Sequence, residues 1–361
     1  MVGFEKEDKE IGERMKTIVH ILNTGSFSGA ENVVVTLIRQ MKKRYKDEYR
    51  MIYVSLKGSI EAKLIEENIE YCLLEKLSIG SIKGVIKEYN PNIIHAHDYR
   101  ASMLSSVVHG NIPVICHLHN NQLALKRLGM KSILYFITTF QYKKILTVSE
   151  AVNKEYVFGR FVQEKVQMIG NPIDNEYILY KASLEDGEEY DVVFLGRLSE
   201  PKNPIRFINI MKKIVTSFPD VKVAMIGTGE LEGECRKLIE ELNLKKNVFL
   251  LGFRDNPYVI LKNAKLLCVT SIWEGFGLMA IESLALGIPV ISTGVGGLKN
   301  IVTDDCGHIC ENDEEFIYQI EKLLEDKIYQ KKLSEGALKR SEELENIENY
   351  VRTIKIVYED I

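Results

Sequence analysis

Short apolar runs alternate with longer segments of helical hydrophobic spacing along most of the chain. In the first half the apolar runs occupy residues 17–22, 51–56, 92–95, 113–117 and 145–148. The second half shows the same pattern, with runs at residues 191–195, 222–226, 247–251, 266–270 and 289–292. Short apolar runs between helical segments are typical of strands that are buried on both faces of a parallel sheet. The pattern therefore predicts an α/β protein with two doubly wound sheets.

A cluster of helix-breaking residues at Asn171 and Pro172, followed by a polar, acidic stretch at residues 182–190, separates the two halves. We expect a first domain at residues 15–172 and a second at residues 173–345, because 361 residues are enough for two cores. Residues 1–14 are charged and lack the apolar centre of a secretory signal, so we expect a flexible leader. Two doubly wound domains imply a ligand cleft between them, at the carboxyl ends of the strands.

The charge is distributed unevenly between the halves. Residues 15–172 contain 21 Lys and Arg against 13 Asp and Glu, a balance of +8, whereas residues 173–361 contain 23 against 33, a balance of −10. A basic first half and an acidic second half suggest different partners. No apolar run is long enough to span a bilayer, and the six cysteines show no disulfide framework. We therefore expect a cytoplasmic protein, and no nucleic-acid partner.

The strongest chemical signal is the segment that begins at Glu274. Gly275 and Gly277 allow close approach of a ligand to the backbone, and the amide of Leu278 opens a predicted helix, where anions bind. Glu282 follows Glu274 by eight residues and lies inside that helix. Two carboxylates beside an anion site fit a ligand that combines hydroxyl groups with phosphate. The alternative is a strand, turn and helix with two incidental glutamates.

Two further loops follow predicted strands and contain glycine. The loop that begins at Gly196 carries Arg197 and Lys202, and these cations suit a diphosphate whose departure they would stabilise. Solvated loop charges are the alternative. In the first half, Gly25 and Gly29 lie between a strand and a helix and are candidates for phosphate contact, or for an ordinary tight turn.

Histidines gather near two strand ends in the first half, as the pairs His95 and His97, and His117 and His119. Because side chains alternate along a strand, each pair places two imidazoles on one side. We expect His119 to enter the cleft. A metal site with three or four ligands is the competing interpretation, although no ligand spacing marks one. Surface or satisfied core positions are expected for His20, His109 and His308.

Residues 123–144 are apolar and aromatic between basic flanks. One interpretation is a helix that touches an anionic membrane surface. The other is a helix of the first domain with one buried face.

Taken together, these motifs resemble glycosyltransferase family 4, which has the GT-B fold of two Rossmann-like domains that face each other across a cleft. The resemblance covers nearly the whole chain from Met15. It is carried by Glu274 with Glu282 and by the loop from Gly196 to Lys202. Further matching positions are Gly227, Gly229, Gly296, Gly297 and Asn171 to Asp174. The resemblance also implies that a terminal helix at residues 346–361 crosses back to the first domain.

The resemblance assigns roles in binding a nucleoside diphosphate sugar, with uridine as the expected base. Arg197 and Lys202 would bind the diphosphate and Glu282 the ribose hydroxyls, while the backbone at Phe253 and Arg254 would contact the base. The loop residues expected to line the donor site are Gly196, Gly275, Phe276, Gly277 and Leu278, with Gly25 and Gly29 from the first domain. Where the family often has two glycines in that first loop, this chain has Ser28 before Gly29.

Glu274 and His119 are the expected catalytic residues, because the resemblance places both beside the transferred sugar. The implied reaction is a retaining hexosyl transfer to a glycan or lipid-linked acceptor in cell-surface polysaccharide synthesis, with no bound metal and no cofactor. Within this family, the chain resembles the bacterial capsule and exopolysaccharide transferases. Peripheral contact with an anionic membrane, at the inner face of the plasma membrane, would fit the basic first half.

Two other functions compete with this one. A catalytically inactive module that binds a sugar nucleotide would share the same motifs. A nicotinamide oxidoreductase would share the fold class, but neither half contains the G-x-G-x-x-G fingerprint with an acid about twenty residues further on.

Overall fold

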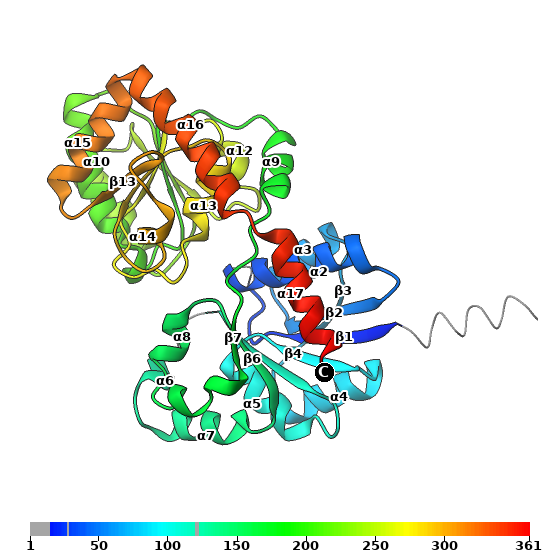
Figure 1. Cartoon of the computed structure of the whole chain (residues 1–361). Coiled ribbons are helices and arrows are strands. Elements are labelled where there is room, and N and C mark those ends of the chain that lie inside the picture. Colours follow the sequence, from blue (N-terminus) through cyan, green and yellow to red (C-terminus); the bar gives the residue numbers. More distant parts are fainter. Residues whose placement is uncertain (1–14, 27–28, 120–122) are drawn as a thin grey trace, which may run out of the picture. The chain divides into compact units, whose positions relative to one another are not determined.

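The computed structural model describes residues 15–26, 29–119 and 123–361, so the expected leader lies outside the described residues. The chain forms two compact units (Figure 1). The first comprises the chain up to Pro172 together with Asn346–Ile361, and the second is Ile173–Glu345. Each unit contains one parallel sheet with helices on its faces, so the doubly wound α/β architecture is confirmed.

The first unit has a seven-stranded sheet in the order β3-β2-β1-β4-β5-β6-β7 among its described residues. Its strands are β1 (Lys16–Ile21), β2 (Tyr49–Leu56), β3 (Glu70–Leu74), β4 (Ile93–Ala96), β5 (Val114–Leu118), β6 (Tyr142–Thr147) and β7 (Val166–Met168). Its helices are α2 (Gly29–Tyr45), α3 (Ile60–Glu66), α4 (Ile79–Tyr89), α5 (Tyr99–Val108), α6 (Leu123–Lys126), α7 (Met130–Thr139), α8 (Glu150–Lys154) and α17 (Ile347–Glu359). Residues 18–21 of β1 are buried because the strand lies inside the sheet, paired with β2 and β4.

Helix α17 is part of the first unit although it follows the second unit in the sequence. Its residues Tyr350, Ile354 and Tyr358 are buried. Lys16 Nζ donates a hydrogen bond to the carbonyl oxygen of Tyr358 at 2.9 Å, and Lys355 Nζ donates to the Glu48 carboxylate at 2.6 Å. The last helix is therefore bonded to the first strand and to the loop before β2.

The second unit has a six-stranded sheet in the order β10-β9-β8-β11-β12-β13. Its strands are β8 (Val192–Leu195), β9 (Val223–Ile226), β10 (Val248–Gly252), β11 (Leu266–Val269), β12 (Val290–Thr293) and β13 (Gly307–Cys310). Its helices are α9 (Asn175–Ser183), α10 (Pro204–Ser217), α11 (Glu232–Glu241), α12 (Tyr258–Leu261), α13 (Leu278–Ala285), α14 (Leu298–Ile301), α15 (Asp313–Glu325) and α16 (Lys327–Leu344).

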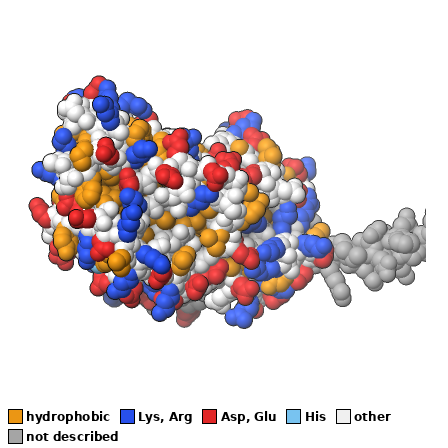
Figure 2. Space-filling view, turned by 90° about the horizontal axis from the view of Figure 1, so that it is seen from above, with side chains coloured by type: hydrophobic (Ala, Val, Ile, Leu, Met, Phe, Trp, Pro, Cys, Tyr) orange, Lys and Arg blue, Asp and Glu red, His pale blue; other side chains and the backbone are white. Residues whose placement is uncertain are grey.

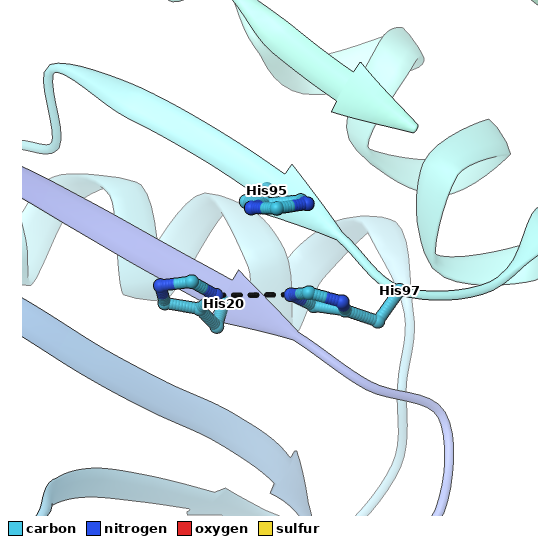
Figure 3. Close-up of side chains that lie close together, drawn as sticks. All are labelled: His20, His95 and His97. Carbon is cyan, nitrogen blue, oxygen red and sulfur yellow. Dashed lines mark hydrogen bonds between the residues drawn. The ribbon is translucent and has the colours of Figure 1, made fainter. Parts of the chain in front are cut away.

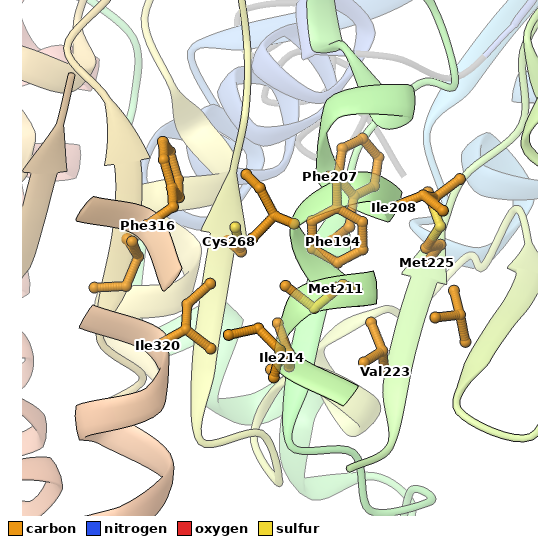
Figure 4. Packing of buried hydrophobic residues seen from close by; sticks show 14 of the residues in the cluster. Phe194, Phe207, Ile208, Met211, Ile214, Val223, Met225, Cys268, Phe316 and Ile320 are labelled. Atoms are coloured by element: carbon orange, nitrogen blue, oxygen red, sulfur yellow. The ribbon is translucent and has the colours of Figure 1, made fainter. Parts of the chain in front are cut away.

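One core of the second unit lies between its sheet and helices α10 and α15 (Figure 4). Phe194 of β8 meets Phe207 of α10 with ring centroids 5.3 Å apart, and Phe316 and Ile320 of α15 are fully buried in the same cluster. Burying a large apolar side chain contributes about 1.5–3 kcal/mol, so this cluster holds the sheet and both helices together. The strand ends that carry the loops are fixed as a result.

In each sheet the strand order reverses beside the first strand, between β1 and β4 and between β8 and β11. Ligands of open α/β sheets bind at such switch points, outside the carboxyl ends of the strands. The loops after β1 and β4, and those after β8 and β11, are therefore the places where the predicted residues matter most.

The segment at residues 123–144 is not one helix. It contains α6, then α7, then the start of β6. Gly129, in extended conformation, precedes α7, and Tyr142 is buried in the core of the sheet. Helix α7 buries Tyr135 and exposes apolar side chains on its other side, so the predicted buried face is present together with an apolar exposed one.

Apart from the apolar side of α7, the surface carries a mixture of charged and apolar side chains. On the face drawn in Figure 2, acidic and basic side chains are interspersed and hydrophobic side chains form small groups between them. Within the described part of the chain, no helix has both the length and the apolar character needed to cross a membrane.

Candidate functional site

The loops after β8 and β11 are bonded to each other at the switch point of the second sheet. Thr270 Oγ1 donates a hydrogen bond to the carbonyl oxygen of Asn203 at 2.9 Å, and the amide of Ile272 donates to the carbonyl oxygen of Pro201 at 2.8 Å. The two loops that the sequence identified separately thus form one structure.

Lys202 and Glu274 form an ion pair across these loops. Their side chains are 20% and 11% exposed, respectively, so the pair is mostly but not completely shielded from water. An anion that takes Lys202 as its partner would release the Glu274 carboxylate, which could then accept hydrogen bonds from hydroxyl groups. The sequence named both residues but not their pairing.

The turn after Glu274 rests directly on the loop after β12. A Cβ atom at Gly296 would lie 1.7 Å from the carbonyl oxygen of Glu274, and one at Gly297 would lie 2.1 Å from that of Phe276. The amide of Gly297 also donates a hydrogen bond to the carbonyl oxygen of Gly275 at 3.2 Å. The two glycines after β12 are therefore needed for backbone packing, which fixes the turn that carries Glu274.

The turn leads into α13 through Gly277, whose φ of 92° is one that other residues rarely adopt. No side chain caps the first turn of α13 among the described residues. The amide of Ala280 donates to the carbonyl oxygen of Gly277 at 3.0 Å, which leaves the amides of Leu278 and Met279 available to an anion. A Cβ at Gly275 would meet only a ring atom of Trp273, at 4.0 Å, so this position faces open space.

Glu282 lies in the second turn of α13 and is mostly buried. Burial raises the pKa of its carboxyl from 4.5 to about 7, while a hydrogen bond from Tyr258 OH, 3.1 Å from Oε1, acts in the opposite direction. Tyr258 belongs to α12 and was not identified from the sequence, because no motif marks it. A carboxyl that is partly protonated near neutral pH can both donate to and accept from a hydroxyl.

The loop after β8 is held by glycines of the loop after β9. Cβ atoms at Gly227 and Gly229 would lie 2.0 Å and 2.2 Å from the carbonyl oxygens of Gly196 and Leu198. Arg197 points out of this fixed loop, is exposed, and forms no ion pair with any residue that the structure describes. Its guanidinium is therefore available to an anion near the same edge of the sheet.

Phe253 and Arg254 follow β10 at the same edge, two strands from β8. Phe253 is 48% exposed and Arg254 is exposed as well. The structure does not bring them into contact with the Lys202–Glu274 pair, so their expected role at the base of a nucleotide stays a prediction.

In the first unit, Gly25 is required for packing. A Cβ there would lie 2.3 Å from the carbonyl oxygen of Lys57, and the amide of Ile60 donates to the carbonyl oxygen of Gly25 at 3.0 Å. This close approach supports the tight-turn interpretation for Gly25. Gly29 opens α2 and has free space where a Cβ would be, whereas Ser28 lies outside the described residues.

Five histidines from β1, β4 and β5 or the residue positions just after them form one cluster. They are His20, His95, His97, His117 and His119, and Figure 3 shows the first three. As alternation along a strand predicts, the rings of His95 and His97 are 4.2 Å apart and those of His117 and His119 are 4.1 Å apart. Burial lowers the pKa of every ring, to about 3 for His20 and His119, so all five are neutral.

His20 is a core residue with partners, one of the two positions expected for it. The sequence did not reveal that it contacts His97, because that contact depends on the pairing of β1 with β4. The metal interpretation has a geometric basis in two groups of described residues whose ligand atoms lie within 4.8 Å of one another. They are His20 with His95 and His97, and His97 with His117 and His119.

Two family models match the chain in succession. Residues 27–177 match the model described as Glycosyltransferase Family 4, and residues 178–340 match the one described as Glycosyl transferases group 1. This chain belongs to glycosyltransferase family 4. The boundary between the two matches lies close to the boundary between the two units.

Two relatives and one solved structure illustrate the similarity. The chain is 34% identical over 297 residues to the poly(glycerol-phosphate) alpha-glucosyltransferase of Bacillus subtilis, covering 81% of this chain and 43% of the relative. It is 33% identical over 190 residues to the N-acetylgalactosamine-N,N'-diacetylbacillosaminyl-diphospho-undecaprenol 4-alpha-N-acetylgalactosaminyltransferase of Campylobacter jejuni, covering 51% of each. The chain thus spans about half the length of these relatives. The crystal structure of Anabaena HepE with UDP and glucose superposes with a TM-score of 0.80 at 18% identity, over 96% of this chain and 100% of that one, so both share the GT-B fold.

Proposed function

We propose that this glycosyltransferase family 4 member transfers a hexosyl group from a nucleoside diphosphate sugar, with uridine as the base, to a glycan or lipid-linked acceptor. The observation that carries the proposal is the Lys202–Glu274 ion pair, which lies at the switch point of the second sheet beside the uncapped start of α13. A diphosphate satisfies Lys202, Arg197 and the helix amides, and the sugar hydroxyls satisfy Glu274. The proposal agrees with the UDP and glucose bound to HepE.

The proposed chemistry is a retaining transfer without a bound metal. The bond between the anomeric carbon and the diphosphate oxygen breaks, and the acceptor oxygen bonds to the same face of that carbon. The proton of the acceptor hydroxyl passes to the departing phosphate oxygen. Lys202 and Arg197 supply positive charge where the leaving group gains negative charge, which is the role that a metal ion has in other enzymes.

The proposed acceptor rests on the names of the relatives, and the proposed location at a membrane rests on one surface of the first unit. The relatives act, by their names, on a poly(glycerol phosphate) and on a diphospho-undecaprenol-linked sugar. We propose an acceptor of this kind, in cell-surface polysaccharide synthesis in the cytoplasm, at the inner face of the plasma membrane. A lipid-linked acceptor requires the enzyme to approach that membrane.

Helix α7 offers a surface for such an approach. Its apolar side chains Met130, Ile137 and the adjoining Phe140 are 78%, 57% and 68% exposed. Lys131 and Lys143 are exposed near them in the sequence, as an anionic membrane surface would require. The structure thus gives this part of the chain an apolar exposed face next to basic residues.

The central test is Glu274→Gln, with Glu240→Gln as the matched control. Both glutamates form an ion pair with a lysine of the second unit, but Glu240 pairs with Lys245 on the exposed surface. We expect Glu274→Gln to lower transfer roughly 100-fold or more, since losing one interaction with a reacting group has effects of this order, and Glu240→Gln to leave it unchanged. Near-normal turnover in Glu274→Gln would refute the assigned role.

Three measurements test the alternative function and the proposed chemistry. A panel of nucleoside diphosphate sugars, screened first by thermal shift and then for product, distinguishes a transferase from an inactive binding module. The anomeric configuration of the product, read by NMR, tests retention. Activity that is lost with EDTA and restored by a divalent ion would contradict the metal-free site.

Membrane contact is tested with liposomes that contain anionic lipid at low salt. We expect the protein to bind and Ile137→Glu to weaken binding, while Ile65→Glu, at a position of α3 that is 63% exposed, serves as the control. Binding should fall as salt screens the basic residues. A protein that does not bind these liposomes at low salt contradicts this part of the proposal.

A further inference from the structure

Four buried or partly buried side chains of the first unit form a continuous row of hydrogen bonds. His20 Nε2 lies 3.3 Å from Met51 Sδ, His20 Nδ1 lies 2.9 Å from His97 Nε2, and His97 Nδ1 lies 3.0 Å from His119 Nε2. Figure 3 shows the central bond of this row, between a ring on β1 and a ring just after β4. We call Met51, His20, His97 and His119 the histidine relay.

Each ring of the relay is taken as neutral, because a shielded imidazolium would need an anionic partner, whereas the described hydrogen-bond partners of these rings are one another and a thioether. A neutral imidazole carries one N–H donor and one acceptor nitrogen. Every bond of the relay must therefore point in the same direction along the row, since a ring that donates through one nitrogen accepts through the other.

Met51 sets the direction of the hydrogen bonds along the relay. A thioether sulfur accepts a hydrogen bond but has no proton to donate. His20 Nε2 must therefore donate to Met51 Sδ, which leaves His20 Nδ1 as an acceptor. His97 then donates to His20 through Nε2, and His119 donates to His97 through Nε2. The opposite direction would place a lone pair of His20 against the sulfur and a buried N–H at His119 Nδ1.

We propose that the histidine relay holds His119 as the Nε2–H tautomer, so that its Nδ1 is always a hydrogen-bond acceptor. Met51, His20 and His97 are then positioning residues, because they act on a ligand only through His119. The relay is rigid at its inner end, where His20 is fully buried and Met51 is 3% exposed.

The outer end of the relay needs a donor. His119 Nδ1 is buried and has no hydrogen-bond partner among the described residues. An acceptor in this state is satisfied by an O–H or N–H group but is repelled by a phosphate or carboxylate oxygen, which has only lone pairs. If the proposed function holds, the relay thus selects a hydroxyl of the sugar or acceptor at this point and excludes the diphosphate.

A second row of hydrogen bonds in the same cluster has no fixed direction. Tyr358 OH lies 2.7 Å from His95 Nδ1, and His95 Nε2 lies 3.3 Å from His117 Nδ1. A phenol can donate or accept, so Tyr358 does not fix a direction. The contrast shows that the terminal group, rather than the number of histidines, sets the tautomer in the relay.

The test reads the tautomer directly on the full chain. We expect long-range ¹H–¹⁵N spectra of protein with ¹⁵N-labelled histidine to show His119 protonated at Nε2, with assignment by a His119→Asn variant. A wild-type His119 that is protonated at Nδ1 would overturn the proposal. So would one equivalent of zinc bound through the ring nitrogens of His97, because those nitrogens could not then form the relay.

Met51→Leu tests the role of the sulfur, with Met41→Leu as the control. Met41 is also fully buried in the first unit, and Met and Leu have similar volumes, so both variants are expected to fold. We expect Met51→Leu to give a mixture of His119 tautomers and Met41→Leu to keep one. Identical tautomers in the two variants would overturn the proposal.

These spectra require no substrate, so the tautomer can be established or refuted whether or not the chain transfers sugar. In Met51→Leu, equal population of the two hydrogen-bond directions would leave half of the molecules with His119 as the Nε2–H tautomer. In a transfer assay this would raise the apparent KM about twofold with little change in kcat. Wild-type kinetics in Met51→Leu, combined with mixed tautomers, would overturn the role of His119 Nδ1 as the acceptor for a ligand hydroxyl.

Discussion

The buried carboxyl of Glu282 makes the stability of the protein depend on pH in a direction that can be worked out. Burial raises its pKa in the folded chain from 4.5 to about 7. The folded state therefore holds this proton more tightly than the unfolded state. The stabilising contribution is fully present below pH 4.5 and is lost as the pH rises through 7.

The size of the effect follows from the shift. A change of one pKa unit corresponds to about 1.4 kcal/mol, so the shift of Glu282 corresponds to about 3 kcal/mol at most. Glu282→Gln has no proton to lose. The advantage of this variant over the wild type should thus grow by about 3 kcal/mol between pH 4.5 and pH 8, or roughly 6–12 °C in Tm.

The assay is thermal unfolding of the full chain at several pH values, for the wild type, Glu282→Gln and Glu240→Gln. The pKa of Glu240 is lowered below 4.5 by its hydrogen bond with Lys245, so its contribution is lost only as the pH falls below that value, and the stability of this control relative to the wild type should change little between pH 4.5 and pH 8. Tyr258→Phe removes the hydrogen bond that opposes the shift, and should move the loss of stability to higher pH. A difference between Glu282→Gln and the wild type that stays constant from pH 4.5 to pH 8 would refute the reasoning.

Two other substitutions test single contacts. Gly297→Ala places a Cβ 2.1 Å from the carbonyl oxygen of Phe276 and should displace the turn before α13, so we expect thermal shifts with UDP to disappear. Gly84→Ala is the control and should retain these shifts, because a Cβ at Gly84 would meet no atom within 4 Å beyond its chain neighbours and the backbone of its own helix. Tyr358→Phe removes the hydroxyl that contacts His95 Nδ1 and should lower the free energy of unfolding by about 1–3 kcal/mol, because a buried nitrogen loses its partner. An unchanged urea midpoint in that variant would mean that the hydroxyl contributes nothing.

The fold class was accessible from the sequence because apolar runs mark buried parallel strands. The runs at residues 191–195 and 266–270 became β8 and β11, the strands that flank the switch point. Strands β3, β7 and β13 were missed. All three are at sheet edges, where a strand is covered less completely and its hydrophobic run is shorter or interrupted.

The candidate site could be predicted only in part, for a similar reason. Glu274 and Lys202 stood out because each lies in a glycine-containing loop after a strand, and such a loop is a local signal. Tyr258 did not, because its link to Glu282 exists only once α12 and α13 are folded. The direction of the histidine relay depends on Met51, a residue that no motif marks, and on the register of β1 with its neighbours.

The return of α17 to the first unit has a consequence for synthesis on the ribosome. The second unit is one continuous stretch, Ile173–Glu345, and can fold as soon as that stretch has emerged. The first unit begins earlier but cannot be completed until α17 has been made, because Lys16 and His95 contact Tyr358 in that helix. The domain that is made first is therefore completed last, and until then the side of β1 and β4 that Tyr358 covers is open to chaperones or to other chains.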